Sequence, residues 1–465
     1  MKAIEVAKKL DIRSKIIPRI LRMDDGGLGD LLRYAGDPSI ISLSAGAPDP
    51  ETFPDERIGQ LMIHALSSEG YGKNILQYGK SRGFGPLLDI LPEYLARPNR
   101  QVKTKSENIV VTAGSQEALG LLGEVFLDPA GGSKIAVESP TYIGALGAWK
   151  KFNPNYIEIE TDKDGIIPEK LEEAFIANPD IKFLYTIPTF QNPTGRTIPL
   201  ERRKKIAKIL KKYGQLAVED DPYSELRYEG KDIPSLQSLA PENVIHLFTF
   251  SKTMAPGLRV GGIVFPENMP REEVEDLVKL HKVGIEIDEK IKEIAEDVIE
   301  DEEKNALGEE NVVEVFTKVK ANLELFTSYL TQAIVADYIK SGEIEKHIQE
   351  IREKYKPRRM AMTEAIQEHF PTKYFDVSKP KGGMFIWVSL KKEYQNLASL
   401  FDLDKINDEA AKTYKVDFGK GKWFFANKKT GEISMRLNFT NRTEDELRHA
   451  IQIIGEMLKQ RLPAF

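Results

Sequence analysis

The chain has 465 residues, of which 41% are hydrophobic and 30% are charged, and its formal net charge is −6. This composition is typical of a globular enzyme and excludes a wholly disordered or fibrous chain. The mild acidity provides no electrostatic footprint for nucleic acid or an anionic membrane, so neither is expected as a partner. The absence of cysteine excludes disulfides, thiolate catalysis and cysteine-bound metal centres.

Two further features of the sequence concern its location and metals. There is no signal-peptide pattern at the N-terminus and no apolar run of membrane-spanning length, so a cytoplasmic protein is expected. The six histidines are scattered without metal-site spacing, and no metal is expected.

Short apolar segments alternate with amphipathic stretches through the first half of the chain. Buried strands that alternate with helices are typical of a largely parallel sheet covered by helices on both faces. Strands are predicted at 108–112, 134–137, 181–187, 215–219, 244–250 and 260–265, and helices at 115–126 and 200–213.

The second half has a different character. Residues 271–356 are highly charged and predicted to be mostly helical. Residues 382–388 and 432–439 are predicted strands of a smaller C-terminal unit. A helix over 443–461 closes the chain, and its start, Thr443–Glu446, has the pattern of a capping box.

An acidic segment interrupts this helical region. Residues 286–314 hold 13 acidic residues and three lysines. The pattern fits a solvated helical insertion, or else an acidic flap or partner surface, and the sequence does not choose between them.

Polar residues follow the carboxyl ends of four predicted strands. In an open α/β sheet, ligands bind outside these ends. Each group alone is more simply a turn, a helix cap or an exposed lysine, but their joint occurrence indicates a binding site. The groups are the turn Gly114–Gln116 before a helix, then Asn192, then Asp220 with Tyr223, and then Ser251 with Lys252.

This set of groups suits one cofactor, pyridoxal phosphate. A lysine amine forms a Schiff base with a carbonyl. A carboxylate holds a ring nitrogen protonated, which makes the ring an electron sink. An amide and a phenol can hydrogen-bond a ring hydroxyl, and a nest at a helix start can bind a phosphate.

Over residues 40–462 the chain resembles the fold type I, class I and II aminotransferases. It is most similar to the branch that contains kynurenine, 2-aminoadipate and archaeal aromatic aminotransferases. The nine motifs, in family order, are SLSAGAPDPETFP (42–54), LQYGKSRGFGPL (76–87), TAGSQEAL (112–119), ESPTYIGAL (138–146), FQNPTGRT (190–197), VEDDPYSEL (218–226), TFSKTMAPGLRVGG (249–262), KGGMFIWV (381–388) and SMRLNFT (434–440).

The resemblance implies an α/β fold of two domains. A large domain with a mostly parallel seven-stranded sheet between helices is accompanied by a smaller α+β domain. The expected division is an N-terminal arm with part of the small domain at 1–55, the large cofactor-binding domain at 56–340, and the small domain at 341–465. The acidic insertion, at about 284–316, is expected to modify substrate entry or choice.

The resemblance also implies catalytic roles around the cofactor ring. Lys252 matches the Schiff-base lysine that also shuttles the substrate proton. Asp220 matches the partner of the pyridine nitrogen. Asn192 and Tyr223 match the hydrogen-bonding pair for the ring hydroxyl, and Tyr142 matches the aromatic residue that stacks on the ring.

A second set matches the phosphate site of the family. Ser115, Gln116 and Ser251 are implied donors, and Arg259 is the implied countercharge. Thr249 stands where many relatives carry serine, which keeps a hydroxyl at that position.

A third set concerns the substrate and the second subunit. Arg436 matches the arginine that binds the substrate α-carboxylate, a role that suits a planar fork. Gly46 would let the backbone approach the substrate. Tyr78 matches a residue that reaches the neighbouring subunit's phosphate, which implies a homodimer with shared active sites.

The activity implied is amino transfer, by a ping-pong mechanism, from an L-amino acid to a 2-oxo acid such as 2-oxoglutarate. Aromatic, 2-aminoadipate-like, kynurenine-like or bulky aliphatic donors are expected. Two alternatives remain from the sequence: a pyridoxal-phosphate lyase or synthase on the same fold, and a non-catalytic cofactor-binding regulatory protein.

Overall fold

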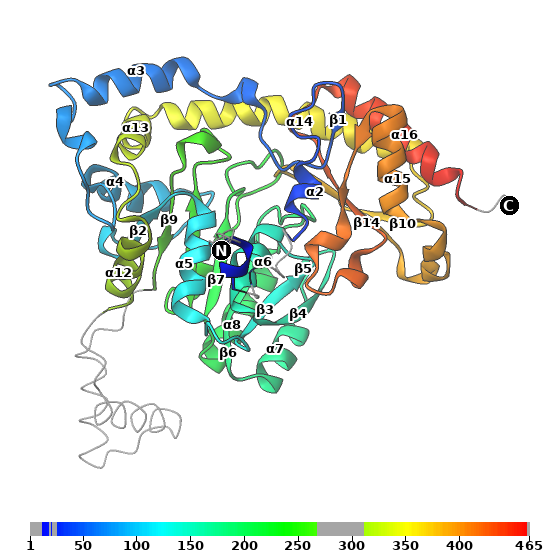
Figure 1. Cartoon of the computed structure of the whole chain (residues 1–465), viewed down its shortest axis with the longest axis horizontal. Coiled ribbons are helices and arrows are strands. Elements are labelled where there is room, and N and C mark those ends of the chain that lie inside the picture. Colours follow the sequence, from blue (N-terminus) through cyan, green and yellow to red (C-terminus); the bar gives the residue numbers. More distant parts are fainter. Residues whose placement is uncertain (1–11, 18–19, 21–25, 267–310, 463–465) are drawn as a thin grey trace, which may run out of the picture.

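The computed structural model describes residues 12–17, 20, 26–266 and 311–462, which form a large unit and a smaller one side by side (Figure 1). Most of the acidic insertion predicted at about 284–316 lies outside the described residues, so its structure and its role at the substrate entrance stay predictions. Within the described ranges, no helix combines the length and apolarity needed to cross a membrane.

An eight-stranded sheet forms the centre of the large unit. The four pairs between β3, β4, β6, β7 and β8 are parallel, whereas β9 runs antiparallel to both of its neighbours. In spatial order the strands are β2 (Ile109–Thr112), β9 (Gly261–Val264), β8 (Val244–Thr249), β7 (Ala217–Asp221), β6 (Ile181–Thr186), β3 (Lys134–Ser139), β4 (Asn155–Asp162) and β5 (Gly165–Ile166).

The expected mostly parallel sheet is therefore confirmed, with one strand more than the seven predicted. The extra strand, β5, is a two-residue antiparallel hairpin partner of β4. The turn between them forms because the Asp162 carboxylate accepts a hydrogen bond from the Asp164 amide at 2.7 Å, and Gly165 adopts a φ of +86°. So short a local feature has no periodic signature in the sequence.

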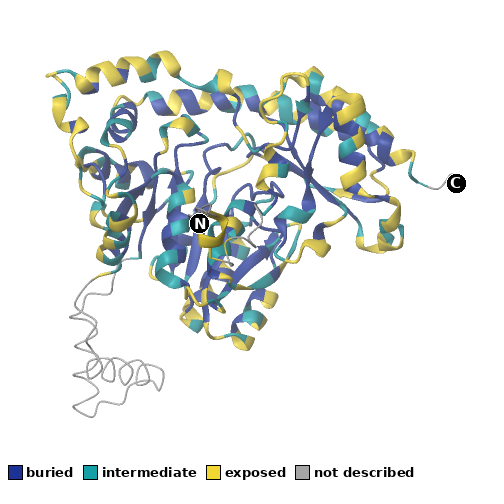
Figure 2. Cartoon of the chain, viewed as in Figure 1, coloured by how far each residue is buried: buried dark blue, intermediate teal, exposed yellow. Residues whose placement is uncertain are grey.

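Helices cover both faces of this sheet, as Figure 2 shows by the buried strands between helices with exposed outer sides. Alternate strand residues face opposite layers: Val137 packs with α5 and α6, whereas Ala136 packs with α7 and α8. The helices of this unit are α3 (Asp55–Leu66), α4 (Gly85–Leu95), α5 (Ser115–Phe126), α6 (Ile143–Trp149), α7 (Pro168–Ala177), α8 (Leu200–Tyr213), α9 (Leu236–Leu239), α12 (Val312–Glu324) and α13 (Tyr329–Lys340).

The smaller unit is built on a four-stranded antiparallel sheet with a separate apolar core. A short parallel pair ties the N-terminal segment to it, because the Ile41 amide donates to the Lys415 carbonyl at 2.8 Å and the Leu43 amide donates to the Asp417 carbonyl at 2.7 Å. Its elements are α2 (Leu28–Leu32), β1 (Ile41–Ser42), β10 (Phe375–Val377), β11 (Phe385–Leu390), α15 (Leu403–Glu409), β12 (Val416–Asp417), β13 (Gly419–Lys420), β14 (Ser434–Asn438) and α16 (Glu444–Lys459).

Helix α14 (Glu343–His369) joins the two units (Figure 1). Ile348 and Ile351, in its first half, pack into cores of the large unit. Met362 and Ile366, in its second half, pack into the core of the small unit. Because one helix serves both cores, the predicted boundary at 340/341 remains a prediction.

Several predicted elements agree closely with the structure. Helices α5 and α8 span the predicted residues, and α16 begins at a capping box in which Thr443 and Glu446 bond to each other's backbone amides. The predicted strand 382–388 is shifted, since β11 begins at Phe385. The Gly383 amide donates instead to the Leu226 carbonyl of the large unit at 2.9 Å.

The cap of α16 generates a stability prediction. Thr443→Ala should lower the free energy of unfolding by about 1 kcal/mol, because the amide of Glu446 loses its acceptor. Urea unfolding followed by circular dichroism measures this change. Thr413→Ala, which removes an exposed threonine outside a cap, is the control. Equal midpoints for the two variants would contradict the assigned role of the cap.

Candidate active site

The carboxyl ends of β2, β3, β6, β7 and β8 meet at one edge of the large sheet, and most of the predicted site residues lie there. The loops after these strands carry Gly114 to Gln116, Tyr142, Asn192, Tyr223 and Lys252, while Asp220 lies at the end of β7. Arg436 comes from β14 of the small unit. The site is therefore assembled between the two units.

Asp220 is a buried carboxylate with one engaged oxygen. Its Oδ2 accepts a hydrogen bond from the Tyr185 hydroxyl at 2.8 Å. Its Oδ1 has no hydrogen-bond partner among the described residues, although it is fully shielded from solvent. Burial raises the pKa of Asp220 to about 7, and the Tyr185 hydrogen bond opposes this rise. A buried, unpartnered carboxylate oxygen fits a cationic donor such as a protonated ring nitrogen.

Lys252 follows β8 and reaches toward the N-terminal segment. Its Nζ donates a hydrogen bond to the Gly46 carbonyl at 3.0 Å. Burial, together with the positive charges of Arg436 and Arg259, lowers the pKa of Lys252 to about 8. The lowered pKa increases the fraction of neutral amine near physiological pH, and the neutral amine is the form that acts as a nucleophile or base.

Arg436 is a buried guanidinium without an acidic partner among the described residues. It donates to the Asn192 Oδ1 at 2.9 Å and to the Ser44 carbonyl, and it lies over the Phe385 ring at 4.3 Å and the Phe424 ring at 4.7 Å. Burial lowers its pKa to about 10, so it remains cationic at neutral pH. A buried cation among rings and amides is an anion-binding group whose anion must come from a ligand.

Asn192 and Tyr223 extend from this arginine toward the sheet. The Asn192 amide donates to the Tyr223 hydroxyl at 3.3 Å, while its oxygen accepts from Arg436. Both side chains are buried. This chain joins the predicted ring-hydroxyl pair to the predicted carboxylate-binding residue in one polar network.

Gly46 leaves space beside the arginine. A Cβ at this position would lie 3.3 Å from the Phe385 ring and 3.7 Å from both terminal nitrogens of Arg436. A side chain there would therefore crowd the Arg436 guanidinium.

The predicted phosphate residues gather at the start of α5. Gly114, with a φ of +75°, precedes Ser115, and a Cβ on Gly114 would lie 3.1 Å from both terminal nitrogens of Arg259. The Ser115 hydroxyl has no partner among the described residues. These features form a cradle of backbone amides, a hydroxyl and a guanidinium, which suits a phosphate group.

The other phosphate-site residues are held in place by local hydrogen bonds. The Thr249 hydroxyl donates to the Ser251 hydroxyl at 3.0 Å and accepts from the Ser251 amide at 3.2 Å. The side-chain amide of Gln116 donates to the Gly144 carbonyl at 3.1 Å.

Tyr142 precedes α6 and lies close to the charged groups of the site. Burial raises its pKa, with the negative charge of Asp220 adding to the rise and the positive charges of Arg436 and Arg259 opposing it. Its ring covers the site of a Cβ on Gly144. This is a suitable location for an aromatic residue that stacks on a ligand ring.

Tyr78 is not brought together with the other predicted residues. Its side chain is 77% exposed, and its ring meets Phe326 edge-on at 5.9 Å. Within a single chain it has no role at this site.

Two contributors to the site were not predicted from the sequence. Tyr185 donates to Asp220, and the carbonyl of Ser44 accepts from Arg436. Tyr185 is one residue in an apolar strand, and its position next to the last residue of β6 is the only signal that could have drawn attention to it.

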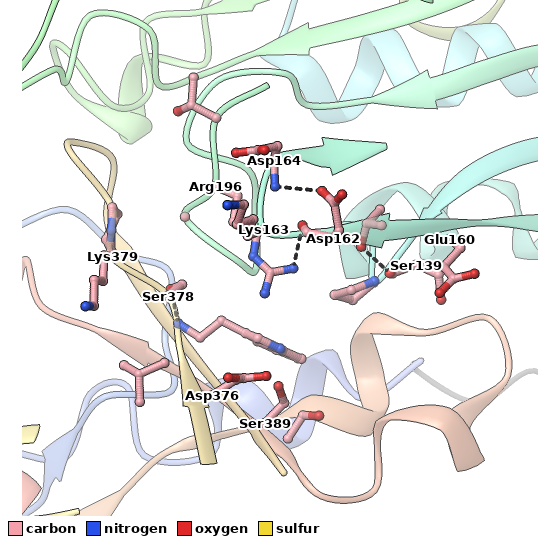
Figure 3. A pocket seen from close by; sticks show the side chains of 18 of the residues that line it. Ser139, Glu160, Asp162, Lys163, Asp164, Arg196, Asp376, Ser378, Lys379 and Ser389 are labelled. Carbon is pink, nitrogen blue, oxygen red and sulfur yellow. Dashed lines mark hydrogen bonds between the residues drawn. The ribbon is translucent and has the colours of Figure 1, made fainter. Parts of the chain in front are cut away.

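A cavity of about 1580 Å³ lies elsewhere between the two units (Figure 3). Asp162, Lys163 and Arg196 of the large unit face Asp376 and Lys379 of the small unit across it. It is lined by none of the predicted site residues. No group of three or more metal-ligating side chains occurs within the described residues.

Comparison with known proteins places this geometry in a family. The family model "Aminotransferase class I and II" matches residues 38–454. The aromatic-amino-acid aminotransferase 1 of Thermococcus litoralis is 34% identical, over 98% of this chain and 97% of that protein.

Two solved structures agree with this match. The kynurenine aminotransferase of Pyrococcus horikoshii, in complex with PMP, has a TM-score of 0.80 and 34% identity, covering 98% of this chain and 99% of that chain. The α-aminoadipate aminotransferase of Thermus thermophilus, complexed with N-(5'-phosphopyridoxyl)-L-leucine, has a TM-score of 0.76 and 28% identity, covering 97% of this chain and 99% of that chain. The chain therefore belongs to the class I and II aminotransferases, and it is a fold type I aminotransferase that uses pyridoxal phosphate and acts on amino acids and 2-oxo acids.

Proposed function

We propose that this enzyme transfers the amino group of an L-amino acid with an aromatic, 2-aminoadipate-like, kynurenine-like or bulky aliphatic side chain to a 2-oxo acid such as 2-oxoglutarate, by a ping-pong mechanism. The observation that carries the proposal is the buried Arg436, which lacks an acidic partner among the described residues and contacts Asn192 at 2.9 Å. Both substrates of a transaminase carry an α-carboxylate, and one arginine can bind each in turn.

The apolar surroundings of Arg436 support the proposed donors. Leu31, Ile143, Trp387, Phe424 and Phe425 form a buried cluster, with Tyr142 and Trp423 packed against it. Phe424 of this cluster lies against the Arg436 guanidinium, and apolar residues beside a carboxylate-binding arginine favour large apolar or aromatic side chains over small or charged ones. The relatives, which include an aromatic-amino-acid aminotransferase and a kynurenine aminotransferase, point to the same range.

We assign the following roles in catalysis. When bound, pyridoxal phosphate supplies an aldehyde that condenses with amines and a ring that stores electrons. Lys252, with its lowered pKa, holds the neutral amine that takes and returns the α-proton. Asp220 holds the proton on the ring nitrogen through its free oxygen. Tyr142 covers the ring face.

The remaining residues hold the ligands in place. Asn192 and Tyr223 hydrogen-bond the ring hydroxyl, and Arg436 binds the α-carboxylate beside Gly46. The phosphate is bound by the cradle at the start of α5, described above, in which Arg259 supplies the countercharge.

We also propose a homodimer in which Tyr78 completes the phosphate site of the second copy. Apolar side chains are exposed on α3 and on the segment after it, with Ile63 74% and Leu76 65% exposed. Tyr78, 77% exposed, adjoins this surface. A second copy would remove it from water. The cytoplasmic location expected from the sequence stays a prediction.

The half-reaction tests the proposed function. The cofactor-loaded enzyme should show a visible absorption band that fades when a preferred L-amino acid is added without an oxo acid. In Lys252→Ala the fading should slow by about a thousandfold or more, because the proton-transferring amine is lost. Stopped-flow absorption measures the rate for each amino acid.

The control for this experiment is Lys346→Ala, which removes a lysine that is 83% exposed. A band that persists with every L-amino acid would contradict the proposed transfer. Release of an oxo acid over many turnovers without an acceptor would indicate a lyase instead.

Arg436→Lys tests the carboxylate-binding role. A lysine cannot offer two parallel donors, so the KM for the amino donor should rise about ten- to a hundredfold, with a smaller change in kcat. The matched control is Arg442→Lys, a partly buried arginine that donates to the Ile40 carbonyl. An unchanged KM would contradict the assignment.

Hybrid dimers test whether Tyr78 acts across subunits. Tyr78→Phe alone should weaken cofactor binding about tenfold by loss of one hydrogen bond to a charged group. A hybrid of one Tyr78→Phe chain and one Lys252→Ala chain should regain one site of normal affinity and activity. Differently tagged chains, purified in tandem, allow the measurement. If Tyr78 acts within its own chain, the hybrid will contain no normal site.

A further inference from the structure

We propose that Tyr185 is a positioning residue for Asp220. Its hydroxyl holds one oxygen of the Asp220 carboxylate and thereby directs the other oxygen toward the ring nitrogen of the cofactor. This inference rests on the proposed role of Asp220. Two observations carry it: the Tyr185 hydroxyl donates to Oδ2 at 2.8 Å, and Oδ1 is buried without a partner among the described residues.

The strand register places the two side chains on one face of the sheet. Tyr185 of β6 is directly opposite Val218 of the neighbouring parallel strand β7. Asp220 is two residues beyond Val218 and therefore points to the same face. The contact is thus built into the centre of the sheet, and both residues are buried.

Packing leaves the Tyr185 ring little freedom. It meets the Trp149 ring edge-on, with centroids 5.3 Å apart and an angle of 82°. Trp149 is itself fixed, because its indole N–H donates to the Leu119 carbonyl at 2.8 Å. The direction of the Tyr185 hydroxyl, and hence the orientation of the Asp220 carboxylate, is set by this stack.

The hydrogen bond from Tyr185 also favours the ionised form of Asp220. Burial and the neighbouring Asp221 both raise the pKa of Asp220 and so favour its protonated form, whereas the Tyr185 hydroxyl, His246 and the Ser115 hydroxyl favour the ionised form. Tyr185 itself stays protonated, since burial and Asp220 raise its pKa well above its ordinary value. It therefore acts as a permanent donor to Asp220.

The test compares two ligands with Tyr185→Phe: pyridoxal phosphate, and an analogue in which carbon replaces the ring nitrogen. Tyr185→Phe should weaken binding of pyridoxal phosphate about tenfold, because the carboxylate loses a donor. It should leave binding of the analogue unchanged, because the analogue makes no bond to Asp220. Fluorescence titration of the cofactor-free protein gives both dissociation constants.

The matched control is Tyr156→Phe. Tyr156 is a partly buried tyrosine of the same sheet, and its hydroxyl donates to the Leu146 carbonyl at 3.1 Å. Tyr156→Phe should leave the dissociation constants of both ligands unchanged. Nitrogen-15 NMR of labelled pyridoxal phosphate provides a second readout: in Tyr185→Phe the ring-nitrogen resonance should move toward that of an unprotonated pyridine.

The outcomes are distinguishable. An equal loss for both ligands in Tyr185→Phe, or no loss for either, would overturn the positioning role. Equal affinity of the wild-type protein for the two ligands would overturn the role of Asp220, and with it that of Tyr185. If Tyr185→Phe does not fold, the double variant Tyr185→Phe/Asp220→Asn replaces it. Affinity for pyridoxal phosphate below that of Asp220→Asn alone would then contradict the proposal.

Discussion

The active site depends on charges that are buried before any ligand is present. Arg436 lacks an acidic partner within the described part of the chain, and one oxygen of Asp220 lacks a donor there. Burying such groups is unfavourable unless a ligand later completes them. The surrounding cores must therefore supply the stability, and in the proposed roles of Asp220 and Arg436 the site would select a ligand that carries a cationic ring nitrogen and a carboxylate.

The arrangement of strands explains how the charged side chains of the site converge from separate elements. Asp220 and Lys252 come from neighbouring strands of the large sheet, whereas Arg436 comes from the small sheet. Because α14 packs into the cores of both units, apolar contacts hold the two sheets relative to each other, and one of these cores reaches the site at Tyr223 and Phe385. Apolar packing thus determines how Arg436 lies relative to Asp220 and Lys252.

Much of this could be predicted from the sequence, because strand periodicity and polar residues at strand ends are local signals. Helices α5 and α8 and the cap of α16 followed from such signals. Strand β5 did not, since two residues have no periodicity. Tyr185 was missed for a different reason: its partner lies on another strand, and only the register of β6 against β7 reveals the contact.

The aromatic surroundings of Arg436 concern carboxylate binding, which all the proposed substrates share. The guanidinium lies against the Phe385 and Phe424 rings, which exclude water and so strengthen its attraction for a carboxylate. Every amino acid and 2-oxo acid presents this carboxylate. Under the proposed function, discrimination between donors would then fall to apolar residues beside the guanidinium, among which Phe424 belongs to a buried cluster with Leu31 and Trp387. A site built this way can accept different donors with one set of catalytic residues.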